Sequence, residues 1–185
     1  MPTAVVCAAF DAATDQAVLA VRHTVRAAGV TLPDRPPHRP HLSLAAATVD
    51  RDEIDRVVRA AQAVAASRAP FDVPLDQVGR FGRAGVVWLG PSARVPALDE
   101  LQSATDEALR AHGWPRAFGV HSDPAHWVAH CTLATRLPKP FLRQVQHAVR
   151  AAYQPIVARV DALAIILVGG RGDVAHLPLR GVRCR

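Results

Sequence analysis

A short pattern that occurs twice constrains the fold of this chain more than any other feature. The first copy is His41–Leu44 (HLSL) and the second is His130–Leu133 (HCTL). Each reads histidine, apolar residue, hydroxyl residue, leucine, and each is followed by an alanine. With nine histidines in the chain, roughly 0.2 such copies are expected by chance. The fold therefore has to place two equivalent segments, one in each half of the sequence.

Both copies lie in stretches that predict β-strands, and strand geometry gives their spacing a meaning. Side chains alternate between the two faces of a strand, so His41 and Ser43 should share a face, as should His130 and Thr132. An imidazole can move protons near neutral pH, and a hydroxyl can donate to a phosphoryl oxygen. Two such strands side by side predict a cleft for phosphoryl chemistry. For one motif alone, we would favour a half-buried histidine satisfied by the backbone.

The remaining pattern predicts an α+β fold built from alternating strands and helices. Capping residues at Asp11–Asp15 and a stop at Gly29 bound the first helix. Gly82–Gly85 is a hairpin signal. We expect a single domain over residues 1–185, with lobes of roughly 1–92 and 93–185 and termini that can cross between them. Strands are predicted at residues 3–10, 41–47, 71–81, 86–89, 127–135, 155–168 and near 174–179. Helices are predicted from the caps at 11–15 to about 28, and at 52–67, 96–112 and 138–152.

Composition narrows the class of protein. Apolar residues make up 50% of the 185 residues, which supports a buried core. The apolar runs are too short to span a bilayer, and no basic leader precedes the first one, so neither a membrane span nor a signal peptide is expected. Three cysteines without C-x-x-C spacing argue against a disulfide framework and favour the cytoplasm. The net charge of +6 is almost entirely arginine, which suits a phosphate ligand but also fits a GC-rich genome.

Other groups of residues that resemble functional motifs are weaker indications of function. His121, His126, His130 and Cys131 could form a zinc site on a helix. In a strand, however, His126 and His130 would lie about 13 Å apart at roughly 3.3 Å per residue, too far for one metal. No metal site is therefore expected. Gly169–Gly172 lacks the Gly-Lys-Ser/Thr ending of a phosphate loop and reads as a turn, together with Asp173.

With both motifs in view, the chain resembles the two-histidine phosphoesterase superfamily, which includes the 2'-5' RNA ligase-like proteins and the RNA 2',3'-cyclic phosphodiesterases. The resemblance rests on the two His–apolar–Ser/Thr–apolar motifs, one per lobe, and covers nearly the whole chain. The sequence departs from the family pattern at two positions. Ser43 stands where threonine is commoner, and Arg136 is shifted by one residue from the arginine that many members carry after the second motif.

The resemblance implies a bilobal fold of two antiparallel sheets, with helices on the outer faces, a pseudo-twofold axis and a central cleft. It implies that His41 and His130 are the catalytic acid and base, that Ser43 and Thr132 bind the phosphate, and that no metal or cofactor is required. The implied substrate is RNA or a small nucleotide with a cyclic phosphate or phosphodiester, bound by a monomer. A 2'-5' RNA ligase and a non-catalytic binding module remain alternatives. Further candidate substrate contacts are Arg39, Arg136 and Phe81, with Arg80 and Arg83 as other sources of positive charge.

Overall fold

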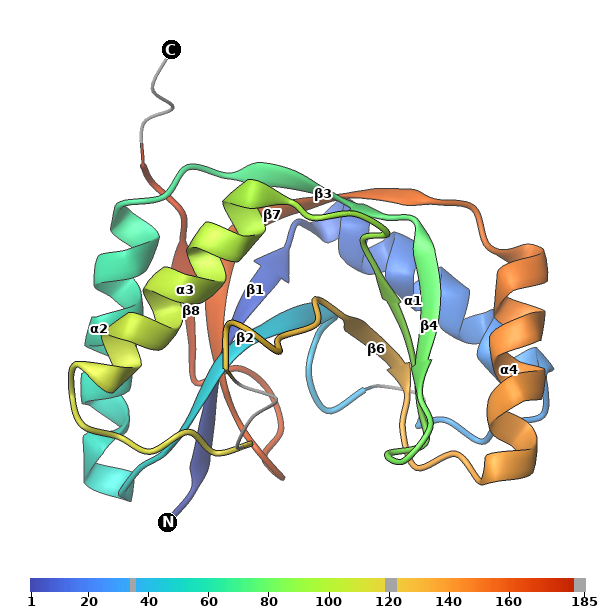
Figure 1. The fold of residues 1–185 in the computed structure, drawn as a ribbon, viewed down its shortest axis with the longest axis horizontal. Helices are drawn as coiled ribbons and strands as arrows, with labels where there is room; N and C mark the ends of the chain where they lie inside the picture. Colours follow the sequence, from blue (N-terminus) through green and yellow to red (C-terminus); the bar gives the residue numbers. More distant parts are fainter. Residues whose placement is uncertain (34–35, 119–122, 182–185) are drawn as a thin grey trace.

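The computed structural model describes residues 1–33, 36–118 and 123–181. Its strands form two antiparallel sheets, one with the order β2-β1-β7-β3 and β8 paired to β7, the other with the order β4-β5-β6 (Figure 1). The α+β class and the two-sheet architecture are thus as predicted. The strands are β1 (Thr3–Phe10), β2 (His41–Thr48), β3 (Phe71–Leu75), β4 (Gln77–Phe81), β5 (Val86–Gly90), β6 (Cys131–Ala134), β7 (Ile156–Leu167) and β8 (Ala175–Pro178). The helices are α1 (Ala12–Ala27), α2 (Ile54–Ala66), α3 (Pro96–Arg110) and α4 (Lys139–Ala152), with a short 3-10 turn at Arg51–Glu53.

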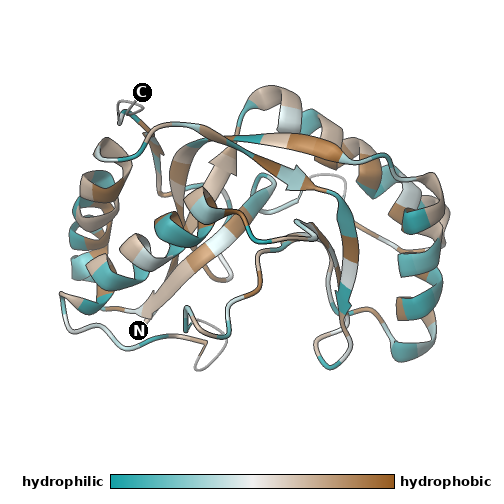
Figure 2. Cartoon of the chain, turned by 45° about the horizontal axis from the view of Figure 1, so that its top comes forward, coloured by the Kyte–Doolittle hydropathy of each residue, from teal (hydrophilic) through white to brown (hydrophobic). Residues whose placement is uncertain are grey.

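The helices lie on the outside of the sheets, in two pairs. α2 and α3 pack on each other beside the larger sheet, whereas α1 and α4 pack on each other beside the smaller one (Figure 1). α4 shows why: Leu142, Val145 and Val149 recur at helical spacing and are buried. Figure 2 shows this helix alternating between hydrophilic and hydrophobic residues. α1 begins where Asp11 accepts a hydrogen bond from the Thr14 backbone amide at 2.8 Å.

The larger sheet holds the first motif in place. β1 is buried along nearly its whole length, and β2 pairs with it so that His41 faces Ala9 and Ser43 faces Cys7. The other side of β1 pairs with β7, the longest strand described. The first motif therefore starts at the end of a strand whose partner is fixed from both sides.

The segment predicted as one strand over residues 71–81 is divided between the two sheets. It breaks at Asp76, whose carboxylate accepts hydrogen bonds from the backbone amide and the hydroxyl of Ser92 at 2.6 and 2.7 Å. β3 before the break joins the larger sheet, and β4 after it joins the smaller one. Each sheet consequently draws strands from both halves of the chain, so the lobes interleave in sequence instead of dividing near residue 92.

The strand predicted over residues 127–135 is shorter than expected, because β6 starts only at Cys131. Two side chains hold the preceding segment out of the sheet. The Val128 carbonyl accepts from the His130 ring at 2.8 Å, and the Trp127 indole donates to the Ser43 carbonyl of β2 at 2.9 Å. His130 thus lies just before its strand. Among the residues described, none of the helices combines the length and hydropathy that a bilayer crossing requires.

Candidate active site

His41 is held by the backbone of its own segment. It is the first residue of β2, half-buried, and its Nδ1 lies 2.8 Å from the carbonyl oxygen of Arg39. Because a carbonyl can only accept, Nδ1 carries the hydrogen. The Nε2 atom is then the one that can accept or deliver a proton.

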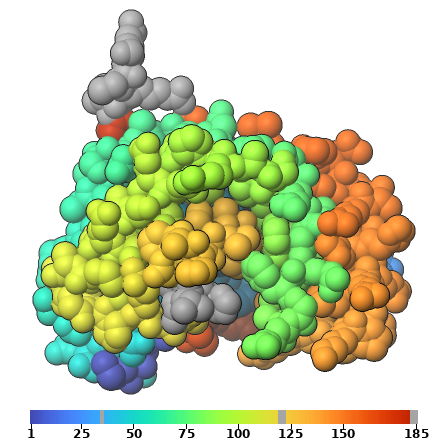
Figure 3. Space-filling view, viewed as in Figure 1, coloured from blue at the N-terminus to red at the C-terminus, as the bar shows by residue number. Residues whose placement is uncertain are grey.

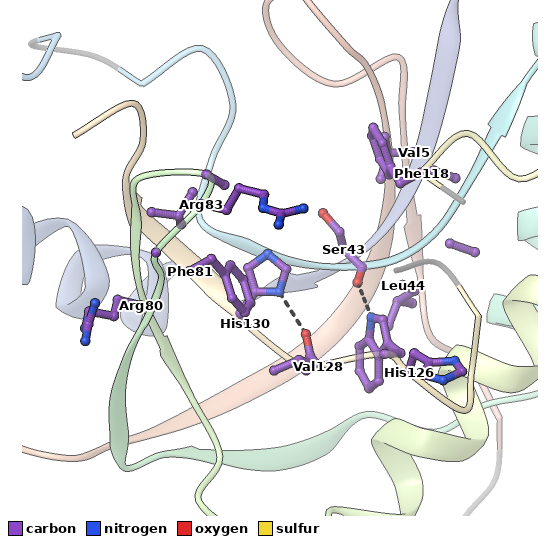
Figure 4. Close-up of a pocket in the computed structure, with 16 residues that line it drawn as sticks. Val5, Ser43, Leu44, Arg80, Phe81, Arg83, Phe118, His126, Val128 and His130 are labelled. Carbon is purple, nitrogen blue, oxygen red and sulfur yellow. Dashed lines mark hydrogen bonds between the residues drawn. The ribbon is translucent and has the colours of Figure 1, made fainter. Parts of the chain in front are cut away.

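His130 repeats this arrangement in the second half of the chain. Its Nδ1 lies 2.8 Å from the Val128 carbonyl, again two residues earlier (Figure 4). Phe81 of β4 meets the imidazole edge-on, with ring centroids 4.9 Å apart, and Trp88 of β5 lies behind at 6.4 Å. Both histidines therefore share one tautomer and one mode of attachment.

The surroundings shift the pKa of both imidazoles. Burial lowers the pKa of His41, while the Arg39 carbonyl and the carboxylates of Asp173 and Asp15 oppose that shift. Burial also lowers the pKa of His130, the Val128 carbonyl opposes it, and the charge of His41 lowers it further. The two rings therefore influence each other's charge, and carboxylates support the protonated form only at His41.

Each histidine lines a hollow, His130 the first and His41 the second. We call the first the aromatic pocket. It measures about 780 Å³ and lies between the two sheets. It opens on the face shown in Figure 3, where the β4–β5 hairpin is on one side and the segment before β6 is on the other. We call the second the basic pocket; it measures about 420 Å³ and lies beside α1. The aromatic pocket is lined by Ser43, Phe81, Arg83, Phe118, Trp127 and His130 among others, and the basic pocket by Arg22, His38, Arg39, His41, Thr132 and Arg136 among others.

Each pocket is lined by the histidine of one motif and the hydroxyl residue of the other. Ser43 lines the aromatic pocket with His130, and Thr132 lines the basic pocket with His41. The alternation rule had placed each histidine with its own hydroxyl. The burial pattern agrees with that rule, because His41, Ser43, His130 and Thr132 are half-buried whereas Leu42, Leu44, Cys131 and Leu133 are buried. The strands of the two motifs, β2 and β6, are in contact, and the charge of His41 acts on His130.

The other predicted contacts differ in their availability. Phe81 contacts His130 as described, and Arg83 extends over the aromatic pocket toward Ser43, whereas Arg80 points away (Figure 4). Arg39 is held by an ion pair with Asp15 at 2.6 Å and donates to the Phe10 carbonyl at 2.8 Å. It fixes α1 and the first motif to each other. Arg136 is exposed at the basic pocket.

Arg22 is a residue that the sequence reasoning missed. It lines the basic pocket from α1, at four residues after Val18 and three before Val25, both of which are buried. Positions spaced in this way share a helix face. A charged residue on the apolar stripe was therefore the signal that could have found it.

No metal-binding cluster exists among the described residues. Of the histidines considered for zinc, His126 lines the aromatic pocket, and His121 falls outside the part of the chain that the structure describes. What the arrangement offers chemically is acid–base catalysis by imidazoles next to hydroxyl and guanidinium groups.

Comparison with known proteins gives one family and one fold. A family model described as the 2'-5' RNA ligase superfamily matches residues 10–172. The structure is similar to that of E. coli LigT complexed with 3'-AMP, with a TM-score of 0.60 and 17% identity over 97% of this chain and 96% of that one. It is also similar to TT0787 of Thermus thermophilus, with a TM-score of 0.63 and 18% identity over 98% and 99% of the two chains. A search of curated proteins finds no match.

Proposed function

Since the chain belongs to the 2'-5' RNA ligase superfamily, we propose that it is a phosphodiesterase that hydrolyses 2',3'-cyclic phosphates on RNA ends or small nucleotides. The observation that carries the proposal is the pair of matched imidazoles. Each has Nδ1 committed to a backbone carbonyl, which leaves Nε2 for proton transfer, and the charge of His41 lowers the pKa of His130. Such a pair can hold one ring neutral and one protonated, as acid–base hydrolysis requires.

In the proposed reaction a water oxygen attacks phosphorus and gives its proton to Nε2 of His130. The bond from phosphorus to one ribose oxygen breaks, and that oxygen takes a proton from Nε2 of His41. His41 is assigned as the acid because Asp15 and Asp173 favour its protonated form. His130 is assigned as the base because burial and the charge of His41 favour its neutral form. Exchange with solvent restores both rings.

The groups around the two histidines can bind the phosphate during the reaction. Ser43 and Thr132 line the two pockets, and their hydroxyls can donate to the non-bridging oxygens. Arg83 extends toward Ser43 (Figure 4) and supplies positive charge where negative charge develops. Phe81 and Trp127 line the aromatic pocket and offer faces on which a base can stack. The similar LigT has been crystallised with 3'-AMP and with ATP, which supports a nucleotide as ligand.

Hydrolysis of adenosine 2',3'-cyclic phosphate by the purified protein tests the proposal. Replacing one general acid or base typically costs about 10²- to 10⁴-fold, so His41→Ala and His130→Ala should each lose activity to that extent while their circular dichroism is unchanged. His147→Ala is the matched control, because His147 is exposed on α4. A chelator should leave the rate unaltered. Full activity in either site variant rules out the assigned pair, whereas no turnover by the native protein rules out hydrolysis and leaves a binding module.

Ligation is the second candidate, and the size of the aromatic pocket favours it. At about 780 Å³ it is far larger than the ~30 Å³ that one water occupies, so a nucleoside hydroxyl could replace the attacking water. An RNA with a 2',3'-cyclic end and one with a 5'-hydroxyl should then yield a joined product. We expect ATP to have no effect on the yield, since the cyclic phosphate supplies the bond that is exchanged.

A further inference from the structure

We propose that the basic pocket is a second phosphate subsite, which binds the 5'-phosphate of the nucleotide whose cyclic phosphate reacts at His41 and His130. This inference rests on the proposed function and extends it from a reacting group to a substrate with two phosphates. Arg22 is the residue we assign as its principal ligand. The subsite would distinguish RNA ends and nucleotides from nucleosides that carry only the cyclic phosphate.

Two of the three arginines that line this pocket have no counter-charge among the described residues. Of the described lining residues, none is Asp or Glu. Arg39 is neutralised by Asp15, but Arg22 and Arg136 make no hydrogen bond or ion pair with any residue that the structure describes. A cavity whose described lining holds two such guanidinium groups and no carboxylate is electrostatically complementary to an anion.

The burial of Arg22 strengthens this argument. The guanidinium is half-buried on the apolar face of α1, and desolvation, together with the charge of Arg26, lowers its pKa. A charge in that position has lost part of its hydration without gaining a counter-ion from residues 1–33, 36–118 or 123–181. A phosphate would restore that interaction, and the surrounding Val18, Leu19 and Leu133 would keep it free of competing water.

Arg136 supports the same conclusion through its backbone. It is the only non-glycine residue with positive φ among those described, at 58°, a conformation that costs about 1 kcal/mol. The conformation is maintained because the Leu137 amide donates to the Gly85 carbonyl at 2.9 Å. Strain that the surrounding structure maintains in this way is typical of ligand-binding positions. Here it places an exposed guanidinium at the rim of the basic pocket.

The basic pocket is also contiguous with the reaction. It is lined by His41 and Thr132, so a ligand in it can contact one of the two proposed catalytic histidines and one of the two phosphate-binding hydroxyls. If His41 protonates the leaving ribose oxygen, as proposed above, the ribose lies on this side and its 5' carbon leads into the pocket. The volume of about 420 Å³ is within the range of pockets that hold small ligands.

Equilibrium binding of two stable ligands to the intact protein tests the subsite. Adenosine 3',5'-bisphosphate should bind about tenfold or more tightly than adenosine 3'-monophosphate, as expected for one charged hydrogen-bonded contact. Arg22→Gln should remove most of that preference. Arg143→Gln should keep it, because Arg143 is an exposed arginine of α4 that lines neither pocket. A dinucleotide with a 3'-phosphate should share the preference if the subsite accepts an internal phosphodiester as well as a terminal phosphate.

The outcomes separate this inference from the proposed reaction. Equal binding of the two ligands by the native protein overturns the subsite, and so does a preference that survives in Arg22→Gln. A preference that depends on Arg22 in a protein unable to hydrolyse cyclic phosphates upholds the subsite and overturns the reaction. Failure to bind either ligand overturns both.

Discussion

Each imidazole of the pair is oriented by a carbonyl two residues earlier in its own segment. Many catalytic histidines depend on a carboxylate for this purpose, which raises the basicity of the ring. A neutral carbonyl fixes the tautomer with a smaller effect on pKa. Burial then dominates, and it lowers the pKa of both rings from the ordinary value of 6.5.

The pH dependence of activity should reflect this lowering. Because kcat/KM reports the pKa values of the free enzyme, we expect a bell-shaped profile with its maximum below pH 6.5. Bound phosphate favours the imidazolium form, so the profile of kcat should be displaced to higher pH. Initial rates between pH 4.5 and 9 measure both. A monotonic kcat/KM profile, or one with its maximum above pH 7, contradicts the assignment of the two rings.

Stability should depend on pH for the same reason. The folded pKa of each ring is below its unfolded value, so between the two the unfolded chain binds more protons. The free energy of unfolding should therefore fall as the pH decreases through 6.5, and this loss should be complete once the pH is below the folded values. Urea titrations at pH 7.5 and 5.5 measure the difference. A double variant with His41→Gln and His130→Gln should show a smaller one, and an unchanged difference would contradict the burial argument.

At the scale of elements, β2 is the outer strand of its sheet. Side chains donate to carbonyls along it, and one of these carbonyls, that of Ala46, also accepts from the backbone amide of Ala117 at 3.2 Å. Trp127 donates to the carbonyl of Ser43 at 2.9 Å, and Gln102 donates to that of Leu44 at 3.2 Å. Arg110 reaches the carbonyl of Ala46 at 3.2 Å. Buried carbonyls need partners, and an open strand edge invites pairing with another chain. The bond from Trp127 additionally ties the segment of the second motif to the strand of the first.

Trp127→Phe tests whether that bond aligns the two motifs. The substitution keeps an aromatic ring and removes the donor, which should cost about 1 kcal/mol and lower kcat several-fold. Gln102→Met is the comparison. Gln102 is a buried residue of α3, and the substitution removes its hydrogen bond to the Leu44 carbonyl, the next one along β2. It should lower the free energy of unfolding by a similar or larger amount with less effect on kcat. Equal loss of kcat in both variants would mean that Trp127 contributes only to stability.

The sequence predicts those elements that depend on local pattern. The bounds of β1 are those expected, and α1 begins at its predicted cap, because burial periodicity and capping are read from neighbouring residues. The break at Asp76 and the late start of β6 depend on Ser92 and Ser43, which are distant in sequence. For the candidate site, the repeated motif points to the histidines. Nothing in the pattern reveals that each pocket combines residues of both motifs.

At the scale of the molecule, the two sheets interleave along the chain. β3 and β4 are separated only by Asp76 yet belong to different sheets, and β7 returns late to pair with β1, β3 and β8. Neither lobe can therefore complete itself without the other's part of the chain. We propose on this basis that residues 1–185 behave as one domain.

A single cooperative unfolding transition should result. Trp88 lies in the smaller sheet, and Trp114 packs under Arg56 of α2, with the guanidinium 5.5 Å from the ring centroid. Because Trp127 is the third tryptophan, it is replaced as well. A Trp88→Phe/Trp127→Phe variant then keeps Trp114 and a Trp114→Phe/Trp127→Phe variant keeps Trp88, so their fluorescence reports different lobes. Within each variant, the fluorescence midpoint should coincide with the midpoint from circular dichroism. Two separated midpoints would show that the lobes unfold independently.

The late arrival of β7 also matters while the protein is being made. β1 leaves the ribosome long before β7, the strand that covers its second edge and ends at Leu167. Until β7 follows, a strand composed mainly of Ala, Val, Cys and Phe has one side without a permanent neighbour, and nascent chains in this situation can associate wrongly. The growing polypeptide should thus depend on chaperone protection until β7 has emerged.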